Sequence, residues 1–133
     1  MTYDKQWNEE KFITRKMMQE NPDVLFIFGD NCHREGKGGQ AKEMRGEPNA
    51  LGIVTKARPD HKPDAYLTDK NYEYYKTVID GDLLILNEEL KSGRKVVFPS
   101  DGIGTGLAKL KENAPKLYDY LQNRIAELKK KYA

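Results

Sequence analysis

The chain has 133 residues, and its 23 lysine and arginine residues nearly balance its 21 aspartate and glutamate residues, for a formal net charge of +2. This small charge does not by itself indicate a nucleic-acid or membrane surface, so recognition of anions must be local. The single cysteine, Cys32, excludes an intramolecular disulfide and a cysteine-based zinc site. We therefore expect residues 1–133 to form one cytoplasmic domain with no metal site, no cofactor and no membrane span.

The first half of the chain predicts two helices and two strands. A helix is expected over residues 4–20, because apolar side chains recur near one helical face. These side chains are Tyr3, Trp7, Ile13 and Met17. The continuous apolar run Val24–Phe28 is typical of a central parallel strand that is covered on both faces. A short helix over 40–45 and a strand over 50–56 follow, and a loop with two prolines comes after the strand.

The second half predicts a third strand between helices. Apolar residues keep helical spacing from 75 to 90, although Gly81 argues against one unbroken helix. Lys95–Pro99 is the expected strand, a helix begins over 107–111, and Pro115 suits the first turn of the last helix. The alternation of helices and strands predicts a small three-layer α/β/α domain with a mostly parallel sheet.

Two glycine-rich turns are the most informative feature of the chain, because each follows an apolar strand and leads into a helix. They are Gly36-Lys37-Gly38-Gly39 and Gly102-Ile103-Gly104-Thr105-Gly106. Glycine permits positive φ and close backbone approach, so such turns can direct several N–H groups at a phosphate. In parallel sheets ligands bind beyond the carboxyl ends of the strands, where both turns fall. We expect two phosphate-binding loops; the alternative is that the turns serve structure alone.

Residues beside the turns add candidate ligand contacts. Asp30 and Asn31 suit a ribose hydroxyl or a base amine, or they only cap structure. Asp101 would face a ribose, a base or a cation, because bound phosphate repels its charge. Lys56 suits a phosphate contact or, with a lowered pKa, attack on a sugar aldehyde carbon; a solvated basic edge is the alternative. The complete set expected to contact the ligand is Gly29, Asp30, Asn31, Gly36, Gly38, Gly39, Gln40, Thr55, Gly102, Ile103, Gly104, Thr105, Gly106 and Leu107.

Three stretches of the chain together form a known pattern. They are Val54-Thr55-Lys56 followed by His61-Lys62-Pro63, Pro99 followed by Ile103-Gly104-Thr105-Gly106-Leu107, and Gly36-Lys37-Gly38-Gly39-Gln40-Ala41. In this pattern the chain resembles macrodomains, specifically the branch of terminal ADP-ribose glycohydrolases and the antitoxins that remove ADP-ribose from DNA. The stretches resemble the catalytic-lysine strand, the second phosphate loop and the first phosphate loop of that branch. The similarity covers about residues 24–128, and the chain also resembles short proteins from phages and bacteria.

The resemblance implies a macrodomain-like protein that binds ADP-ribose or a related adenine-nucleotide ribose, free or attached to protein or nucleic acid. In that branch the lysine forms an adduct with the distal ribose, and an aspartate after the second loop resolves it. Lys56 matches the lysine, whereas Ala108 stands at the place of the aspartate. A hydrolase would thus use Lys56 as nucleophile or electrostatic stabiliser and Asp101 or Asp30 as acid–base. The alternative, which Ala108 favours, is a non-enzymatic reader or sponge of nucleotide signals.

Overall fold

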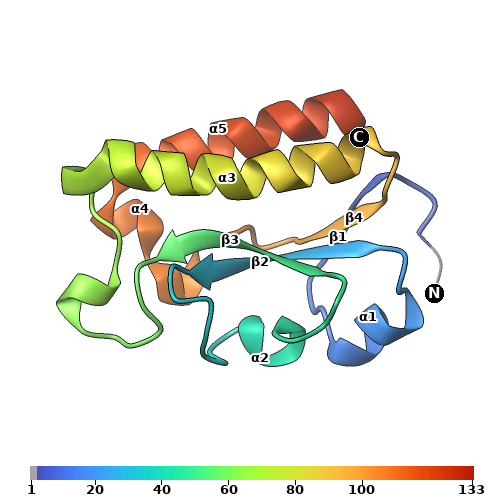
Figure 1. The fold of residues 1–133 in the computed structure, drawn as a ribbon, viewed down its shortest axis with the longest axis horizontal. Coiled ribbons are helices and arrows are strands. Elements are labelled where there is room, and N and C mark those ends of the chain that lie inside the picture. The colour runs from blue at the N-terminus through green and yellow to red at the C-terminus, as the bar shows by residue number, and fades with distance from the viewer. Residues whose placement is uncertain (1–2) are drawn as a thin grey trace.

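Within residues 3–133, the part of the chain that the computed structural model describes, four parallel strands form one sheet. The strands are β1 (Trp7–Glu10), β2 (Leu25–Asn31), β3 (Ala50–Lys56) and β4 (Val96–Pro99). The helices are α1 (Arg15–Glu20), α2 (Ala41–Met44), α3 (Tyr72–Lys91), α4 (Leu110–Asn113) and α5 (Pro115–Tyr132). The strand order is β1-β4-β2-β3, with α3 and α5 on one face and α1 and α2 on the other (Figure 1). The predicted three-layer α/β/α architecture is confirmed.

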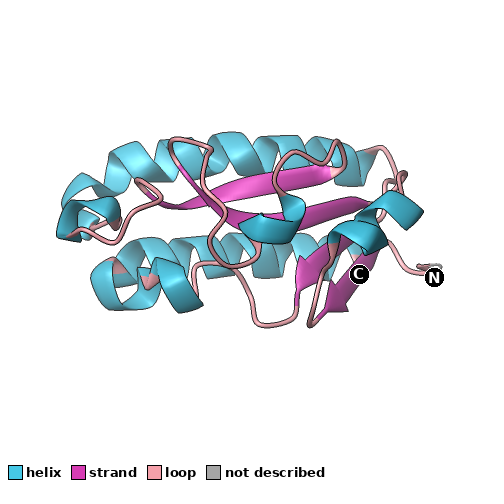
Figure 2. Ribbon diagram, turned by 90° about the horizontal axis from the view of Figure 1, so that it is seen from below, coloured by secondary structure: helices cyan, strands magenta, loops and turns pink. Residues whose placement is uncertain are grey.

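The apolar side chains of β2 explain why both faces of the sheet are covered. Phe26 and Phe28 are buried in the cluster beneath α1 and α2, whereas Leu25 and Ile27 are buried in the cluster beneath α3 and α5. Successive side chains of a strand point to opposite faces, so a continuous apolar run needs cover on both. Figure 2 shows the sheet between the two long helices and the short ones. β2 therefore lies inside the sheet, as predicted.

The N-terminal segment corrects the expectation of one helix over residues 4–20. Trp7–Glu10 is a strand, and only Arg15–Glu20 is helical. β1 pairs in parallel with β4, and the Trp7 ring stacks on Phe98 with 4.4 Å between ring centroids. Pairing with a strand far along the chain overrides the local helical spacing. The sheet consequently has one more strand than the three that were expected.

Three smaller differences concern the bounds of elements. β2 continues through Asn31, so the polar residues at its end are strand residues. α3 runs unbroken through Gly81, where an added side chain would meet open space. The helix expected over 107–111 is divided into a 3-10 turn over Gly106–Ala108 and α4, because Lys109 takes a left-handed φ of 46°.

The long helices are built as their sequences indicate. α5 begins at Pro115 and carries three lysines in its last turn, where the helix dipole favours cations. The apolar side chains of α3 that face the sheet are Ile79, Leu83, Leu86 and Leu90. No helix in the described residues combines the length and the apolar character that crossing a membrane requires.

Candidate functional site

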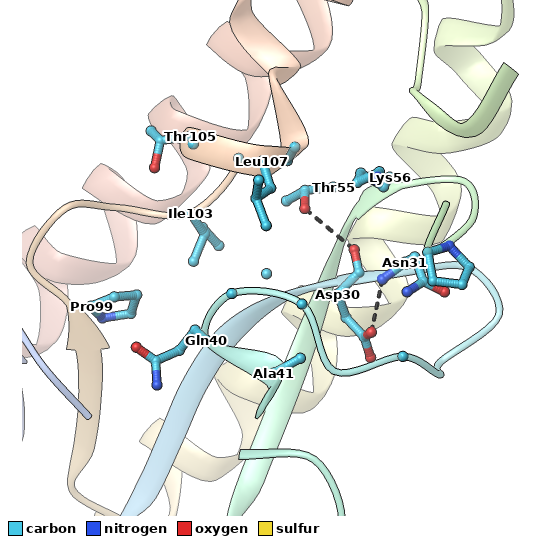
Figure 3. A pocket seen from close by; sticks show the side chains of 18 of the residues that line it. Asp30, Asn31, Gln40, Ala41, Thr55, Lys56, Pro99, Ile103, Thr105 and Leu107 are labelled. Atoms are coloured by element: carbon cyan, nitrogen blue, oxygen red, sulfur yellow. Dashed lines mark hydrogen bonds between the residues drawn. The ribbon is translucent and has the colours of Figure 1, made fainter. Parts of the chain in front are cut away.

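A cavity of about 370 Å³ lies where the strands end at the carboxyl edge of the sheet (Figure 3). Its volume falls within the range of roughly 300–1,000 Å³ that is usual for small-molecule sites. Every residue that the sequence predicted as a ligand contact lines it, from Gly29 to Leu107, and so do Lys56 and Asp101. Ile103 and Leu107 lie on one side of the cavity, and Gln40 and Ala41 lie on the other. The fold thus brings the two glycine turns and the candidate lysine to one place.

The first glycine loop, residues 32–40, is held by the side chains at the end of β2. The Asp30 carboxylate accepts hydrogen bonds from the Arg45 guanidinium at 2.5 and 3.3 Å and from the Asn31 N–H at 2.8 Å. Arg45 Nε in turn donates to the Gly36 carbonyl at 2.7 Å. Asn31 Nδ2 donates to the Glu35 carbonyl at 2.7 Å. Asp30 and Asn31, which we expected to contact a ligand, are therefore engaged in positioning the loop.

A second arginine connects this loop to α3. Arg34 has a left-handed φ of 56°, and its guanidinium lies 3.7 Å from Asp30 and 2.6 Å from Asp82. Asp82 is buried on α3 and also accepts the N–H of Val54 at 2.9 Å. A chain of ion pairs, Arg45–Asp30–Arg34–Asp82, thus runs from α2 to α3 beneath the first loop.

The second glycine loop, residues 100–107, is shaped by its backbone. Gly104 has a φ of +85°, and a Cβ built on it would lie 3.0 Å from Leu110 Cδ2, so a side chain fits poorly here. The Leu110 N–H donates to the Gly104 carbonyl at 3.0 Å. Ile103 anchors the loop because its side chain is buried in the core. No charged side chain is needed to hold this turn.

Several backbone N–H groups in the two loops have no hydrogen-bond partner among the described residues. Six N–H groups donate no hydrogen bond within residues 3–133. They belong to Gly36, Gly38, Gly39, Ile103, Gly104 and Thr105. Turns with free N–H groups form anion-binding concavities. Both sets border the same cavity, so an anion there can receive hydrogen bonds from two sides.

The loops around the cavity contact one another. A Cβ built on Gly38 or Gly39 would lie 3.7 or 3.4 Å from Leu107 Cδ1, so the Leu107 side chain packs beside these glycines. At Gly36, where φ is +95°, a Cβ would lie only 2.8 Å from Pro59 Cβ. Pro59 belongs to the loop after β3, so the first glycine loop packs between the second glycine loop and the loop that follows Lys56.

Lys56, the last residue of β3, forms the β3 side of the cavity. It is 8% exposed, its Nζ donates to the Asp60 carbonyl at 2.7 Å, and it lies 4.8 Å from the centroid of the Tyr66 ring. Burial lowers the pKa of the Lys56 ammonium, and the charge of Asp60 partly opposes this effect. Hydrogen bonds from Arg58 hold the pKa of the Asp60 carboxyl at about 2. The Lys56 ammonium is therefore largely shielded from solvent and loses its proton more easily than an exposed lysine would.

The acids that line the cavity differ in their surroundings. Asp30 is ion-paired with Arg45 as described. Asp101 is exposed, and Glu35 is exposed with its carboxylate 3.6 Å from His33. Ala108 lines the cavity without a functional group. Within residues 3–133, no three His, Cys, Asp or Glu side chains gather as a metal site would require.

Sequence reasoning missed two cations of the cavity. Lys11 follows β1, and its place at the cavity depends on a strand that the helical spacing concealed. Arg45 follows α2 and reaches Asp30 across 15 residues of sequence. The only local signal for Arg45 was its place just before Gly46, at the end of the short predicted helix.

The family model that matches this chain covers residues 8–124 and is described as a family of unknown function, DUF7831. The match spans most of the chain, so the chain belongs to this family. The matched range includes every residue that lines the cavity. No curated protein and no solved structure matches the chain.

Proposed function

We propose that this DUF7831 protein binds ADP-ribose or a related adenine-nucleotide ribose, with the diphosphate held between the two glycine loops. The observation that carries the proposal is that unpartnered N–H groups of both loops border one cavity. A diphosphate presents oxygens on two phosphorus atoms, so it can accept hydrogen bonds from both loops at once. The resemblance of these loops and of Lys56 to macrodomains supports adenine and ribose as the groups on either side.

Lys56 is assigned to the distal ribose. It lies at the end of β3, on the side of the cavity where the first loop meets Pro59. Its ammonium already donates to the Asp60 carbonyl, and an ammonium has three N–H donors. Lys56 can therefore donate to a ribose hydroxyl while it keeps its place.

The surroundings of the acidic residues in the cavity favour binding of the ligand without its hydrolysis. A hydrolase of the kind that the chain resembles needs a carboxylate to resolve the lysine adduct, and Ala108 occupies that place. Asp30 is committed to Arg45, and Asp101 is exposed. We infer that the protein is a reader or sponge of ADP-ribose-type signals, free or attached to a macromolecule.

Hydrolysis through Lys56 is the second candidate, and the lowered pKa of its ammonium favours it. The neutral amine would attack the anomeric carbon of the distal ribose, a C–N bond would form as the glycosidic bond breaks, and the leaving group would depart with the proton that the amine loses. Water would then release the sugar from the lysine.

Calorimetry and thermal unfolding with ADP-ribose test the binding proposal. We expect saturable binding, and a ligand at 100 times its dissociation constant adds about 2.7 kcal/mol to the free energy of unfolding. Lys56→Ala should bind more weakly, whereas Lys62→Ala, at an exposed lysine outside the cavity, should bind as the unaltered protein does. Absence of ADP-ribose binding would overturn the proposal.

Mass spectrometry separates the reader from the hydrolase. A reader releases no ADP-ribose from modified protein or DNA and forms no adduct. A covalent adduct on Lys56, together with release that Lys56→Ala abolishes, would establish the hydrolase instead.

A further inference from the structure

Lys11 differs from Arg45 and Lys56, the other lysine and arginine side chains of the cavity, because its ammonium has no polar partner in the described part of the chain. Arg45 is paired with Asp30, and Lys56 donates to the Asp60 carbonyl. Within residues 3–133, the Lys11 ammonium makes no hydrogen bond and no ion pair, and it lies over the Phe12 ring, 5.7 Å from the centroid. Lys11 is exposed and lines the cavity. Its charge is therefore available to a ligand.

The segment that carries Lys11 is attached to both glycine loops. On one side, the N–H of Ser100, at the start of the second loop, donates to the Glu10 carbonyl at 2.9 Å. On the other side, Gln40 Nε2, at the end of the first loop, donates to the Ile13 carbonyl at 2.6 Å. Lys11 thus lies between two anchor points, one on each loop.

A phosphate in the cavity would be stabilised by a cation that has no partner in the protein. The free N–H groups of the loops carry only partial charges, whereas Asp101 and Glu35, which also line the cavity, are acidic. A phosphate brought between the loops adds further negative charge. A cation without a partner offsets this repulsion, whereas a cation that is already paired contributes less.

We propose that Lys11 is a phosphate-binding residue that supplies the ionic contact for the phosphates of the ligand. This inference rests on the proposed function, and it adds to the glycine loops a side chain from the turn after β1. The loops fix the place of the phosphates through hydrogen bonds, and Lys11 neutralises them. Binding consequently depends on ionic strength through Lys11, because salt screens an exposed charge pair.

The test measures dissociation constants by calorimetry for ADP-ribose and, separately, for inorganic pyrophosphate. The proteins are the unaltered chain, Lys11→Ala, Lys11→Arg and the control Lys16→Ala, whose lysine is exposed on α1 outside the cavity. We expect Lys11→Ala to weaken binding of both probes about tenfold at low salt, the size of one charge-assisted contact. The difference should shrink in about 1 M salt, where the screening length is about 3 Å. Lys11→Arg should retain most of the affinity, and Lys16→Ala all of it.

The outcomes separate this inference from the proposed function. Equal affinities of Lys11→Ala and the unaltered protein for ADP-ribose would overturn the role of Lys11 and leave the proposed function standing. If pyrophosphate bound in a Lys11-dependent way and ADP-ribose did not bind at all, the proposed function would be overturned and the role of Lys11 in phosphate binding would stand. An equal loss in Lys16→Ala would overturn the inference, because it would show a general effect of net charge. Failure to bind either probe would overturn both.

Discussion

The two glycine loops border the same cavity, yet they are held by different interactions. Side chains hold the first loop: Arg45 binds the Asp30 carboxylate and the Gly36 carbonyl. Backbone geometry holds the second: Gly104 takes a positive φ, and its carbonyl accepts the N–H of Leu110. The first loop therefore depends on charged side chains. The second depends on a glycine backbone conformation, on the buried Ile103 side chain and on uncharged hydrogen bonds such as that from Gln122 Nε2 to the Ile103 carbonyl at 2.9 Å. Substitutions can break each dependence separately.

Arg45→Met should give the largest loss of stability. Asp30 would remain buried without its main partner, and breaking a buried ion pair from one side costs about 3 kcal/mol. Urea denaturation measures the loss. The double variant Asp30→Asn/Arg45→Met should lose less than the sum of the single variants, because it leaves no unpaired carboxylate.

The matched control for this ion pair lies on α3. Lys91 lies 3.9 Å from Glu88, and both side chains are exposed, so Lys91→Met should change the free energy of unfolding by no more than about 0.5 kcal/mol. A similar loss in Arg45→Met and Lys91→Met would show that the Arg45–Asp30 pair does not hold the first loop.

Gly104→Ala should give the next largest loss, because it tests the backbone of the second loop. The added Cβ meets both a left-handed φ of +85° and the side chain of Leu110 at 3.0 Å. We expect a loss of about 2 kcal/mol in chemical denaturation. Gly106→Ala is the matched control: φ is +59° there, but nothing lies within 4 Å of the added atom, so about 1 kcal/mol should be lost. Equal losses at both positions would contradict a steric role for Leu110.

The smallest effect on the free energy of unfolding is expected from the titration of Lys56, which lines the cavity beside the first loop. Burial lowers the pKa of this ammonium, so its NMR signals should titrate below the usual lysine value of about 10.4. Between the lowered pKa and the usual lysine value of about 10.4, the unfolded chain binds more protons than the folded one. The free energy of unfolding should therefore rise slightly with pH in that window, and this rise should be absent in Lys56→Met. Titration of Lys56 at or above the usual lysine value would contradict the expected burial effect.

Much of the architecture could be predicted because it depends on local patterns. The apolar run before Gly29 must be covered on both faces, and Pro115 marks the start of α5. β1 could not be predicted in this way, since Trp7-Asn8-Glu9-Glu10 has no apolar run and becomes a strand only by pairing with β4. The apolar side chains that suggested one helix belong to different elements: Trp7 lies on β1, and Ile13 lies in the loop between β1 and α1.

In the candidate site, too, features that depend on local sequence could be predicted, and features that depend on tertiary contacts could not. The glycine turns were found because glycine in that spacing indicates an unusual backbone, and the fold brings both to one cavity. The sequence left open whether Asp30 and Asn31 bind a ligand or only cap structure, because a carboxylate that binds a ligand and one that binds Arg45 look alike in a sequence. Lys11 could not be found, because its place follows from β1.

The attachment of the first loop also bears on how fast a ligand can bind. Arg45 and Asn31 fix this loop when the chain folds, so its conformational entropy is lost at folding and not at binding. A ligand then meets N–H groups that are already in place. Such preorganisation predicts an association rate set by diffusion and orientation, without a slow phase in which the loop closes over the ligand.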